Sequence, residues 1–129
     1  MAEPIEIILL RQWASYLGLP VWIMDAEGSL IFYNEAAELL LGGRRFEESG
    51  AISVEDLSSL FSTRDEEGEP LSAADLPVSV ALMERRPSHR TLVFVGFDGH
   101  ARRIDVTAFP VTGLAGRMLG AVAMFWETA

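Results

Sequence analysis

The densest group of chemically capable side chains in this sequence is a set of four carboxylates. Asp65, Glu66, Glu67 and Glu69 follow one another closely around a glycine and before a proline. Hard oxygen donors of this kind suit calcium or magnesium, but their spacing does not match the calcium loop of an EF-hand. A run of charges in a loop is more often simply solvated. We therefore predict a charged loop here and no metal site.

Two histidines and two adjacent arginines are the other polar candidates. His89 and His100 are not spaced as a zinc-binding pair on one helical face, which needs an interval of four residues. Arg102 and Arg103 are neighbours in a predicted strand, so only one of them can face the interior, where it would suit an anionic ligand. We expect both arginines to lie on the solvent side.

Enzymatic signatures are missing from the sequence. The chain has no Cys and no Lys, which removes disulfides, thiolate metal sites, a cysteine nucleophile and a phosphate-binding loop with its lysine. It also has no Gly-x-Ser-x-Gly motif. Gly113, Gly116 and Gly120 lack the spacing of a dinucleotide fingerprint and are interpreted as loop glycines. We therefore predict a binding or interaction module and not an enzyme.

The composition indicates one globular domain. The 129 residues are 50% hydrophobic, enough for a single core without a metal or disulfide. A net charge of -9 disfavours a nucleic-acid binder, because that affinity comes from clustered positive charge. The apolar run at residues 7–10 is too short for a membrane span and lacks the features of a signal peptide. We expect a cytoplasmic protein, or a cytoplasmic piece of a larger one.

The first part of the chain predicts a helix, a hairpin and a second helix. Apolar side chains at helical spacing favour a helix over residues 5–17, and extended runs at 21–25 and 30–33 flank a turn. Asn34 is placed to cap a helix over residues 35–41, which has acids in its first turn and glycines after it. Asn34 is thus interpreted as a structural residue, and so is Asp25 at the turn.

The second part changes from helical to strand periodicity. Ser53 begins a helical candidate at 54–61, and Pro77 and Pro87 bound a helix at about 76–86. Strands are predicted at 90–97, 101–109 and 118–126, with Asp98-Gly99 as a hairpin turn. Five strands separated by helices favour an α/β (α+β) fold, in which one antiparallel sheet has short helices across one face.

Four stretches of the sequence resemble the PAS domain, a sensory module of bacterial signalling proteins. They are Leu19 to Ala37, Asp65 to Leu82, Phe97 to Pro110 and Gly116 to Phe125. The resemblance implies a PAS domain at residues 19–129, preceded by an amphipathic helix at 1–18. It also implies a role in signal transduction, such as a two-component system, within a sensor kinase, a cyclase or a phosphatase regulator.

The resemblance bears on cofactors as well. Light-sensing members form a covalent flavin adduct with a cysteine, which this chain lacks, while non-covalent flavin stays open. Members that hold haem use a histidine on the central helix, and residues 76–86 contain none. Haem ligation by His89 or His100, just outside that helix, is therefore disfavoured. The cofactor, if there is one, stays unknown at this stage.

Apolar side chains that should converge between the sheet and the helices define the expected ligand pocket. Methionine and alanine can line a cavity without fixing its shape. Either a filled core or a cavity for a small apolar or aromatic molecule fits this composition. The candidate pocket residues are Leu30, Phe32, Leu40, Met83, Ile104, Val106, Ala108, Val122 and Met124.

The N-terminal helix needs a surface to cover its apolar side. Ile5, Leu9, Trp13 and Leu17 lie at helical spacing, and the predicted sheet already has helices on its inner face. We expect this helix to pair with its copy in a homodimer, with packing on the outer face of the sheet as the alternative.

Two other functions stay open from sequence. One is a homodimerisation module that binds no ligand. The other is a small cone-shaped enzyme of the ketosteroid-isomerase type, which would need an acid and a phenol inside an apolar cavity. Asp25 or Asp105 with Tyr16 or Tyr33 are the candidates, although Asp105 alternates onto the wet face of its strand.

Overall fold

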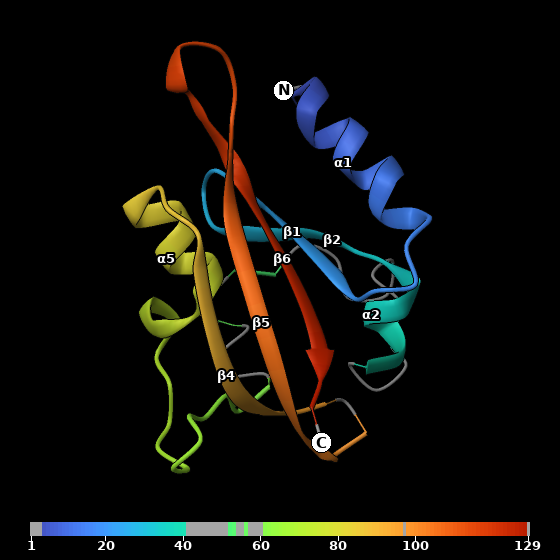
Figure 1. The fold of residues 1–129 in the computed structure, drawn as a ribbon, viewed down its shortest axis with the longest axis vertical. Helices are drawn as coiled ribbons and strands as arrows, with labels where there is room; N and C mark the ends of the chain where they lie inside the picture. The colour runs from blue at the N-terminus through green and yellow to red at the C-terminus, as the bar shows by residue number, and fades with distance from the viewer. Residues whose placement is uncertain (1–3, 41–51, 54–55, 57–60, 97, 129) are drawn as a thin grey trace.

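The computed structural model describes residues 4–40, 52–53, 56, 61–96 and 98–128. The labels used below are those of Figure 1. The elements in chain order are α1 (Ile5–Ser15), β1 (Val21–Asp25), β2 (Ser29–Tyr33), α2 (Glu35–Leu40), β3 (Ile52–Ser53), the 3-10 turn η1 (Ala73–Asp75), α5 (Pro77–Glu84), β4 (Ser88–Val95), β5 (Ala101–Thr112), the 3-10 turn η2 (Leu114–Gly116) and β6 (Met118–Glu127).

All strands belong to one antiparallel sheet in the order β3-β2-β1-β6-β5-β4. The pairing of β1 with β6 sets Val21 opposite Met124 and Asp25 opposite Gly120. This pairing joins the first hairpin to the later three-stranded meander, which confirms the predicted five-stranded layer. The two-residue β3 is an addition at the edge of β2.

Helices cover the two faces of the sheet unequally. Figure 1 shows α5 on one side of the long strands and α1 on the opposite side. We call the face beneath α5 the inner face; its buried cluster includes Met24, Leu30, Phe94, Ile104 and Phe125. The outer face lies beneath α1, and its cluster consists of Ile7, Ala14, Val21, Ile23, Leu119 and Val122. The N-terminal helix therefore packs within its own chain.

The helix ends follow local sequence signals. The Oδ1 atom of Asn34 accepts a hydrogen bond from the backbone N–H of Ala37 at 3.0 Å, which confirms the predicted cap of α2. Pro77 occupies the first turn of α5, and Arg85, the residue after the helix, has a left-handed backbone at φ 55°. The helix α1 ends at Ser15, two residues before the predicted limit.

Two parts of the second half differ from the prediction. The strand β5 continues to Thr112, beyond its predicted end at residue 109, so the loop before β6 begins only at Gly113. Gly120, interpreted from its spacing as a loop glycine although the strand predicted at 118–126 includes it, lies within β6 and is buried. The predicted helix at 54–61 lies largely outside the described residues; the hydroxyl of Ser53 accepts a hydrogen bond from the N–H of Asp56 at 3.2 Å.

In the described parts of the chain, no helix is long and apolar enough to cross a membrane.

Candidate ligand-binding cavity

A cavity of about 40 Å³ lies between the inner face of the sheet and the beginning of α5. The strands contribute Leu92, Ile104, Val106 and Ala123 to its lining, and the approach to α5 contributes Leu76, Pro77 and Val78. Four aromatic side chains and Thr63 complete the described lining. A water molecule needs roughly 10–15 Å³ of such space, so the cavity has room for about three waters or a very small organic molecule.

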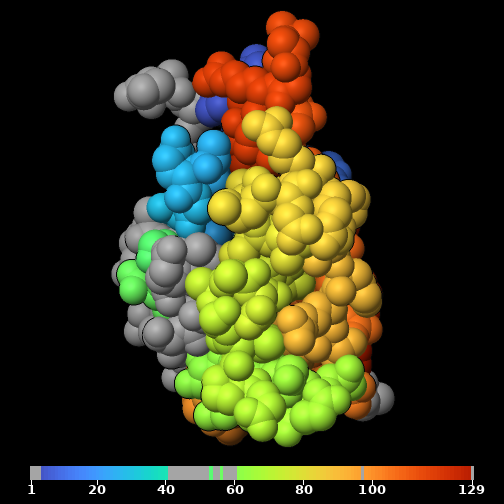
Figure 2. Space-filling model, turned by 90° about the vertical axis from the view of Figure 1, so that its left-hand side faces the viewer, coloured from blue at the N-terminus to red at the C-terminus, as the bar shows by residue number. Residues whose placement is uncertain are grey.

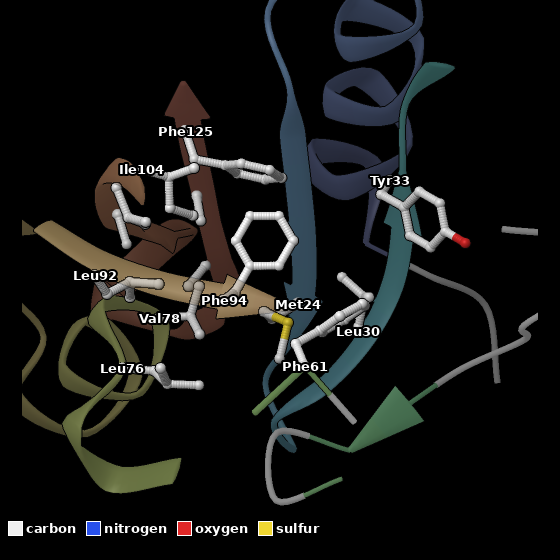
Figure 3. Packing of buried hydrophobic residues seen from close by; sticks show 14 of the residues in the cluster. Met24, Leu30, Tyr33, Phe61, Leu76, Val78, Leu92, Phe94, Ile104 and Phe125 are labelled. Carbon is white, nitrogen blue, oxygen red and sulfur yellow. The ribbon is translucent and has the colours of Figure 1, made fainter. Parts of the chain in front are cut away.

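Two edge-to-face contacts and one tilted contact connect the aromatic rings of the described wall. The ring of Trp22 meets that of Phe125 at a centroid distance of 5.1 Å and an angle of 73°. Phe61 lies 6.1 Å from Trp22 and 5.9 Å from Phe94, and the latter pair is nearly perpendicular at 87°. Figure 3 shows Phe61, Phe94 and Phe125 gathered around the inner face.

The segment 61–64 reaches the cavity because its backbone runs beside β4. Arg64 and Val93 exchange two backbone hydrogen bonds, of 2.8 and 2.9 Å, and the N–H of Val95 donates to the carbonyl of Phe61 at 2.7 Å. Between Phe61 and Thr63, Ser62 has a left-handed backbone at φ 46°, and both Phe61 and Thr63 line the cavity. Sequence reasoning missed both residues because it ended a helix at Phe61 and placed Thr63 in a loop.

The cavity wall formed by α5 is attached at each end. Before the helix, Ser72 and Asp75 form a capping box, and the hydrogen bonds from Ser72 lower the pKa of Asp75. The hydroxyl of Ser79 donates to the carbonyl of Ala73 at 2.6 Å. After the helix, the guanidinium of Arg85 donates to the carbonyl of Gly116 at 2.8 Å. Figure 2 shows α5 and the segment before it packed together over this side of the molecule.

Five of the predicted pocket residues lie on the inner face. Ile104 and Val106 line the cavity itself. Leu30 and Ala108 are fully buried in the inner cluster but do not line the cavity, and Leu40 packs against the edge of the same cluster.

The other four predicted pocket residues are placed elsewhere. Phe32, Val122 and Met124 belong to the outer face, and the Arg11 guanidinium of α1 lies 5.8 Å from the centre of the Phe32 ring. A bulge in the pairing of β1 with β2 disturbs the alternation there, and β6 is apolar on both sides. Met83 is 83% exposed, because α5 buries its opposite side.

The acidic cluster is organised as a turn. The Oδ1 atom of Asp65 accepts hydrogen bonds from the backbone N–H groups of Glu67 and Glu69, both at 2.9 Å. Glu66 pairs instead with Arg103. Among the described residues there is no group of three side chains that could hold a metal ion.

The histidines and arginines lie away from the cavity. His89 and His100 are both exposed, and Nδ1 of His100 is 3.5 Å from Asp98. Asp98 pairs with Arg102 at 2.7 Å, and this guanidinium together with the N–H of His100 holds the pKa of the Asp98 carboxyl far below its usual range. Arg103 is exposed. None of these residues is part of the described lining.

The acid and phenol required by an isomerase do not meet. Asp105 accepts a hydrogen bond from the hydroxyl of Thr91 at 2.6 Å, and Asp25 accepts the backbone N–H groups of its own turn. Tyr16 is 82% exposed. Tyr33 is buried, but Figure 3 shows its ring apart from the ring cluster with the hydroxyl directed away. No tyrosine, aspartate or glutamate belongs to the described lining.

The two cofactors raised by the sequence do not fit this cavity. The described lining contains no histidine to ligate haem iron. The polar edge of a flavin ring needs several hydrogen bonds, whereas Trp22 and Thr63 are the only described lining residues with a polar side-chain atom. A volume of about 40 Å³ is also far below the several hundred Å³ of pockets that enclose a molecule of that size.

The helix α1 is apolar on two sides. Ile7 and Ala14 are buried against the outer face, and Leu17, predicted to face a second chain, packs there too. The other side leaves Ile5, Leu9 and Trp13 exposed by 67%, 56% and 44%. Ile8 and Tyr16 extend this exposed apolar stripe, which we call the α1 stripe.

No family model and no curated protein matches the sequence. Solved structures do match. The PAS domain of Bordetella pertussis BvgS is 14% identical with a TM-score of 0.65, over 96% of this chain and 86% of that one. The PAS domain of nitrogen regulation protein NR(II) from Vibrio parahaemolyticus is 21% identical with a TM-score of 0.62, over 93% and 98%.

A light-oxygen-voltage protein is similar as well. The Rhodobacter sphaeroides LOV protein is 15% identical with a TM-score of 0.74, over 98% of this chain and 69% of that one. These matches cover 93–98% of this chain at TM-scores of 0.62–0.74, which confirms the expected fold class.

Proposed function

We propose that this chain, which has the PAS fold, is a sensory module without catalytic activity of its own. It binds a small apolar or aromatic molecule between the inner face of the sheet and α5, and it regulates a larger signalling protein such as a sensor kinase, a cyclase or a phosphatase regulator. The observation that carries the proposal is a cavity with an apolar lining beneath a short helix.

The attachment of α5 supports a mechanism in which binding in the cavity changes a contact at the surface. Leu76, Pro77 and Val78 belong both to the cavity wall and to the start of the helix. A molecule larger than about three waters has to displace this wall. Such a displacement moves α5 and therefore strains the hydrogen bond from Arg85 to the carbonyl of Gly116, at the tip of the β5–β6 hairpin. Binding and the position of α5 are then coupled, because a ligand favours the state it fits best.

A thermal-shift screen of small neutral molecules tests the ligand. A molecule that binds only the folded state raises the melting temperature as its concentration rises. Ala123→Leu adds three carbons into the cavity from β6 and should abolish the shift. Ala101→Leu, at the exposed start of β5, serves as the control and should keep it. A shift that survives Ala123→Leu places the ligand elsewhere and contradicts the proposal.

Homodimerisation is the second proposed activity, and the α1 stripe is the observation that favours it. Its residues Ile5, Leu9 and Trp13 form an exposed apolar surface on one helix. We propose a second copy of this chain as the occupant. A two-fold axis places identical stripes against each other, and because the stripe side chains are uncharged, they bring no like charges into direct contact.

The mass of the protein in solution tests the dimer. The double variant Leu9→Asp, Trp13→Asp puts four charges into a two-fold interface and should give a monomer in sedimentation equilibrium. Gln12→Asp adds a charge on the same helix at an exposed polar position and should weaken the dimer much less. A wild type that is monomeric at high micromolar concentration excludes the dimer, and so does a double variant that stays dimeric.

A further inference from the structure

Two polar atoms of cavity-lining residues are buried without hydrogen-bond partners. They are Nε1 of Trp22 and Oγ1 of Thr63, and neither has a partner in the structure. Thr63 is 8% exposed. Buried polar groups are nearly always paired in folded proteins, so an unpaired donor calls for an explanation, and a bound molecule is one.

Both residues belong to the cavity lining, and neighbouring elements limit where their side chains can lie. Trp22 lies on β1 between Val21 and Ile23, which face the outer side, and its ring packs against Phe125. The backbone carbonyl of Thr63 already accepts a hydrogen bond from Leu71 at 2.9 Å. The hydroxyl is the part of Thr63 that remains unpaired.

The lining limits what could pair with these atoms. The described lining contains no charged side chain, and burying an ion without a counter-charge is strongly unfavourable. The indole N–H can only donate, whereas a hydroxyl can donate or accept. The matching partner therefore needs an oxygen acceptor for Trp22. A carbonyl or hydroxyl oxygen has two lone pairs, so it also has one with which to accept from Thr63.

We infer that the cavity is selective for small neutral molecules that are mostly hydrocarbon and carry one hydrogen-bond-accepting oxygen, such as a short ketone, aldehyde or alcohol. This inference rests on the proposed ligand-binding function. Both atoms are covered in the structure, each with less than 1 Å² of exposed surface. Binding therefore includes a small rotation of the Thr63 or Trp22 side chain that turns its polar atom toward the oxygen.

Three five-membered rings that differ only in their polar group test the selectivity. Cyclopentanone carries the acceptor oxygen, cyclopentane lacks it and cyclopentanecarboxylate is charged. The signal is the indole N–H resonance of Trp22 in a nitrogen-15 NMR spectrum, identified by its loss in Trp22→Phe. Cyclopentanone should move this resonance downfield, as a new hydrogen bond does. Cyclopentane should bind without that shift, and the carboxylate should not bind.

Thr63→Val removes the hydroxyl and keeps the shape of the side chain. It should weaken cyclopentanone roughly three- to tenfold, the value of one neutral hydrogen bond, and should not weaken cyclopentane. Thr91→Val, on β4 outside the described lining, is the matched control and should change neither affinity.

The outcomes separate the two proposals. If both neutral rings bind, but Thr63→Val affects them equally and the indole resonance stays in place, the selectivity is wrong and the cavity function stands. A resonance already downfield without ligand and unmoved by cyclopentanone indicates a trapped water and also overturns the selectivity. If neither neutral ring binds up to its solubility, both the selectivity and the binding of small apolar molecules are wrong.

Discussion

The side-chain amide of Asn34 donates a hydrogen bond to the backbone carbonyl of Ala14 at 2.9 Å, across 20 positions of sequence. The same amide nitrogen donates to the carbonyl of Leu19 at 2.9 Å, and its oxygen accepts from the N–H groups of Val21 and Ala37 at 3.1 and 3.0 Å. One buried side chain thereby connects the end of α1, the start of β1 and the first turn of α2. Any shift between the sheet and α1 has to pass through this junction or break it.

Asn34→Asp should be more damaging at neutral pH than Asn34→Ala. The carboxylate still accepts from Val21 and Ala37, but it sets a negative oxygen against the carbonyls of Ala14 and Leu19, where the amide donated. Each buried polar group left without a partner costs about 1–3 kcal/mol, and more when it is charged. Urea unfolding at pH 7 measures both losses. Equal stability of the two variants at pH 7 would contradict the hydrogen bonds that the Asn34 amide donates to Ala14 and Leu19.

Lowering the pH should reduce the difference in stability between Asn34→Asp and Asn34→Ala. Burial against two carbonyl oxygens disfavours the ionised form, so the pKa of the introduced carboxyl is higher in the folded protein than in the unfolded chain. The folded state then binds the proton more tightly, and the Asn34→Asp variant regains stability as the pH falls through that raised pKa. Asn34→Ala has no such group and sets the baseline.

The ion pair at the β4–β5 turn predicts the opposite pH dependence: its contribution to stability is lost, and not regained, as the pH falls. Arg102 and the N–H of His100 lower the pKa of Asp98 below its ordinary value of 3.8. The Asp98 carboxylate therefore stabilises the fold fully above about pH 4, where this carboxyl is ionised in the unfolded chain as well. That stabilisation is lost as the pH falls toward the lower pKa that Asp98 has in the folded protein.

Asp98→Asn measures this effect. The difference in unfolding free energy between wild type and Asp98→Asn should be present at pH 7 and should shrink below pH 4. Because the pair lies at the surface, with the side chains of Arg102 and Asp98 16% and 30% exposed, 1 M salt should reduce the difference at pH 7 as well. A difference that grows as the pH falls would contradict the lowered pKa.

The order of elements and the single sheet could be predicted from sequence because their signals are local. Asn34 before two acids, the Asp98-Gly99 turn and the two prolines around α5 each act on the residues beside them. It was harder to predict which residues of each strand or helix face the inner side of the sheet and which face the outer side. The strand β6 is covered on both sides and has apolar residues throughout, so no alternation distinguishes Ala123 on the inner face from Val122 on the outer.

The same ambiguity affects α1. Its sequence carries one apolar set that includes Ile7 and Ala14 and another that includes Leu9 and Trp13, and both have helical spacing. Only the tertiary structure selects the first set to cover the sheet. The cavity wall was missed for another reason: Thr63 enters it through pairing with β4, some thirty residues later, and such long-range pairing leaves no local pattern.

Gly120 is the residue on which the joining of the two halves of the sheet depends most directly. It lies opposite Asp25 where β6 pairs with β1, and a Cβ atom there would overlap the backbone carbonyl oxygen of Met24. A flexible side chain could move aside, but a paired strand cannot move without disturbing its hydrogen bonds. The close approach of β1 to β6 at this point therefore requires glycine.

Gly120→Ala should destabilise the protein by about 1–3 kcal/mol, the usual range for forcing atoms into a packed site. Gly18→Ala is the matched control, because nothing lies within 4 Å of its added carbon and its backbone is not left-handed. That change should be neutral or slightly stabilising, since alanine restricts the unfolded chain. Urea unfolding of both variants measures the contrast. If Gly120→Ala proves as stable as Gly18→Ala, β1 can retreat from β6 at no cost, and the hairpin is then not held to the meander by close backbone contact.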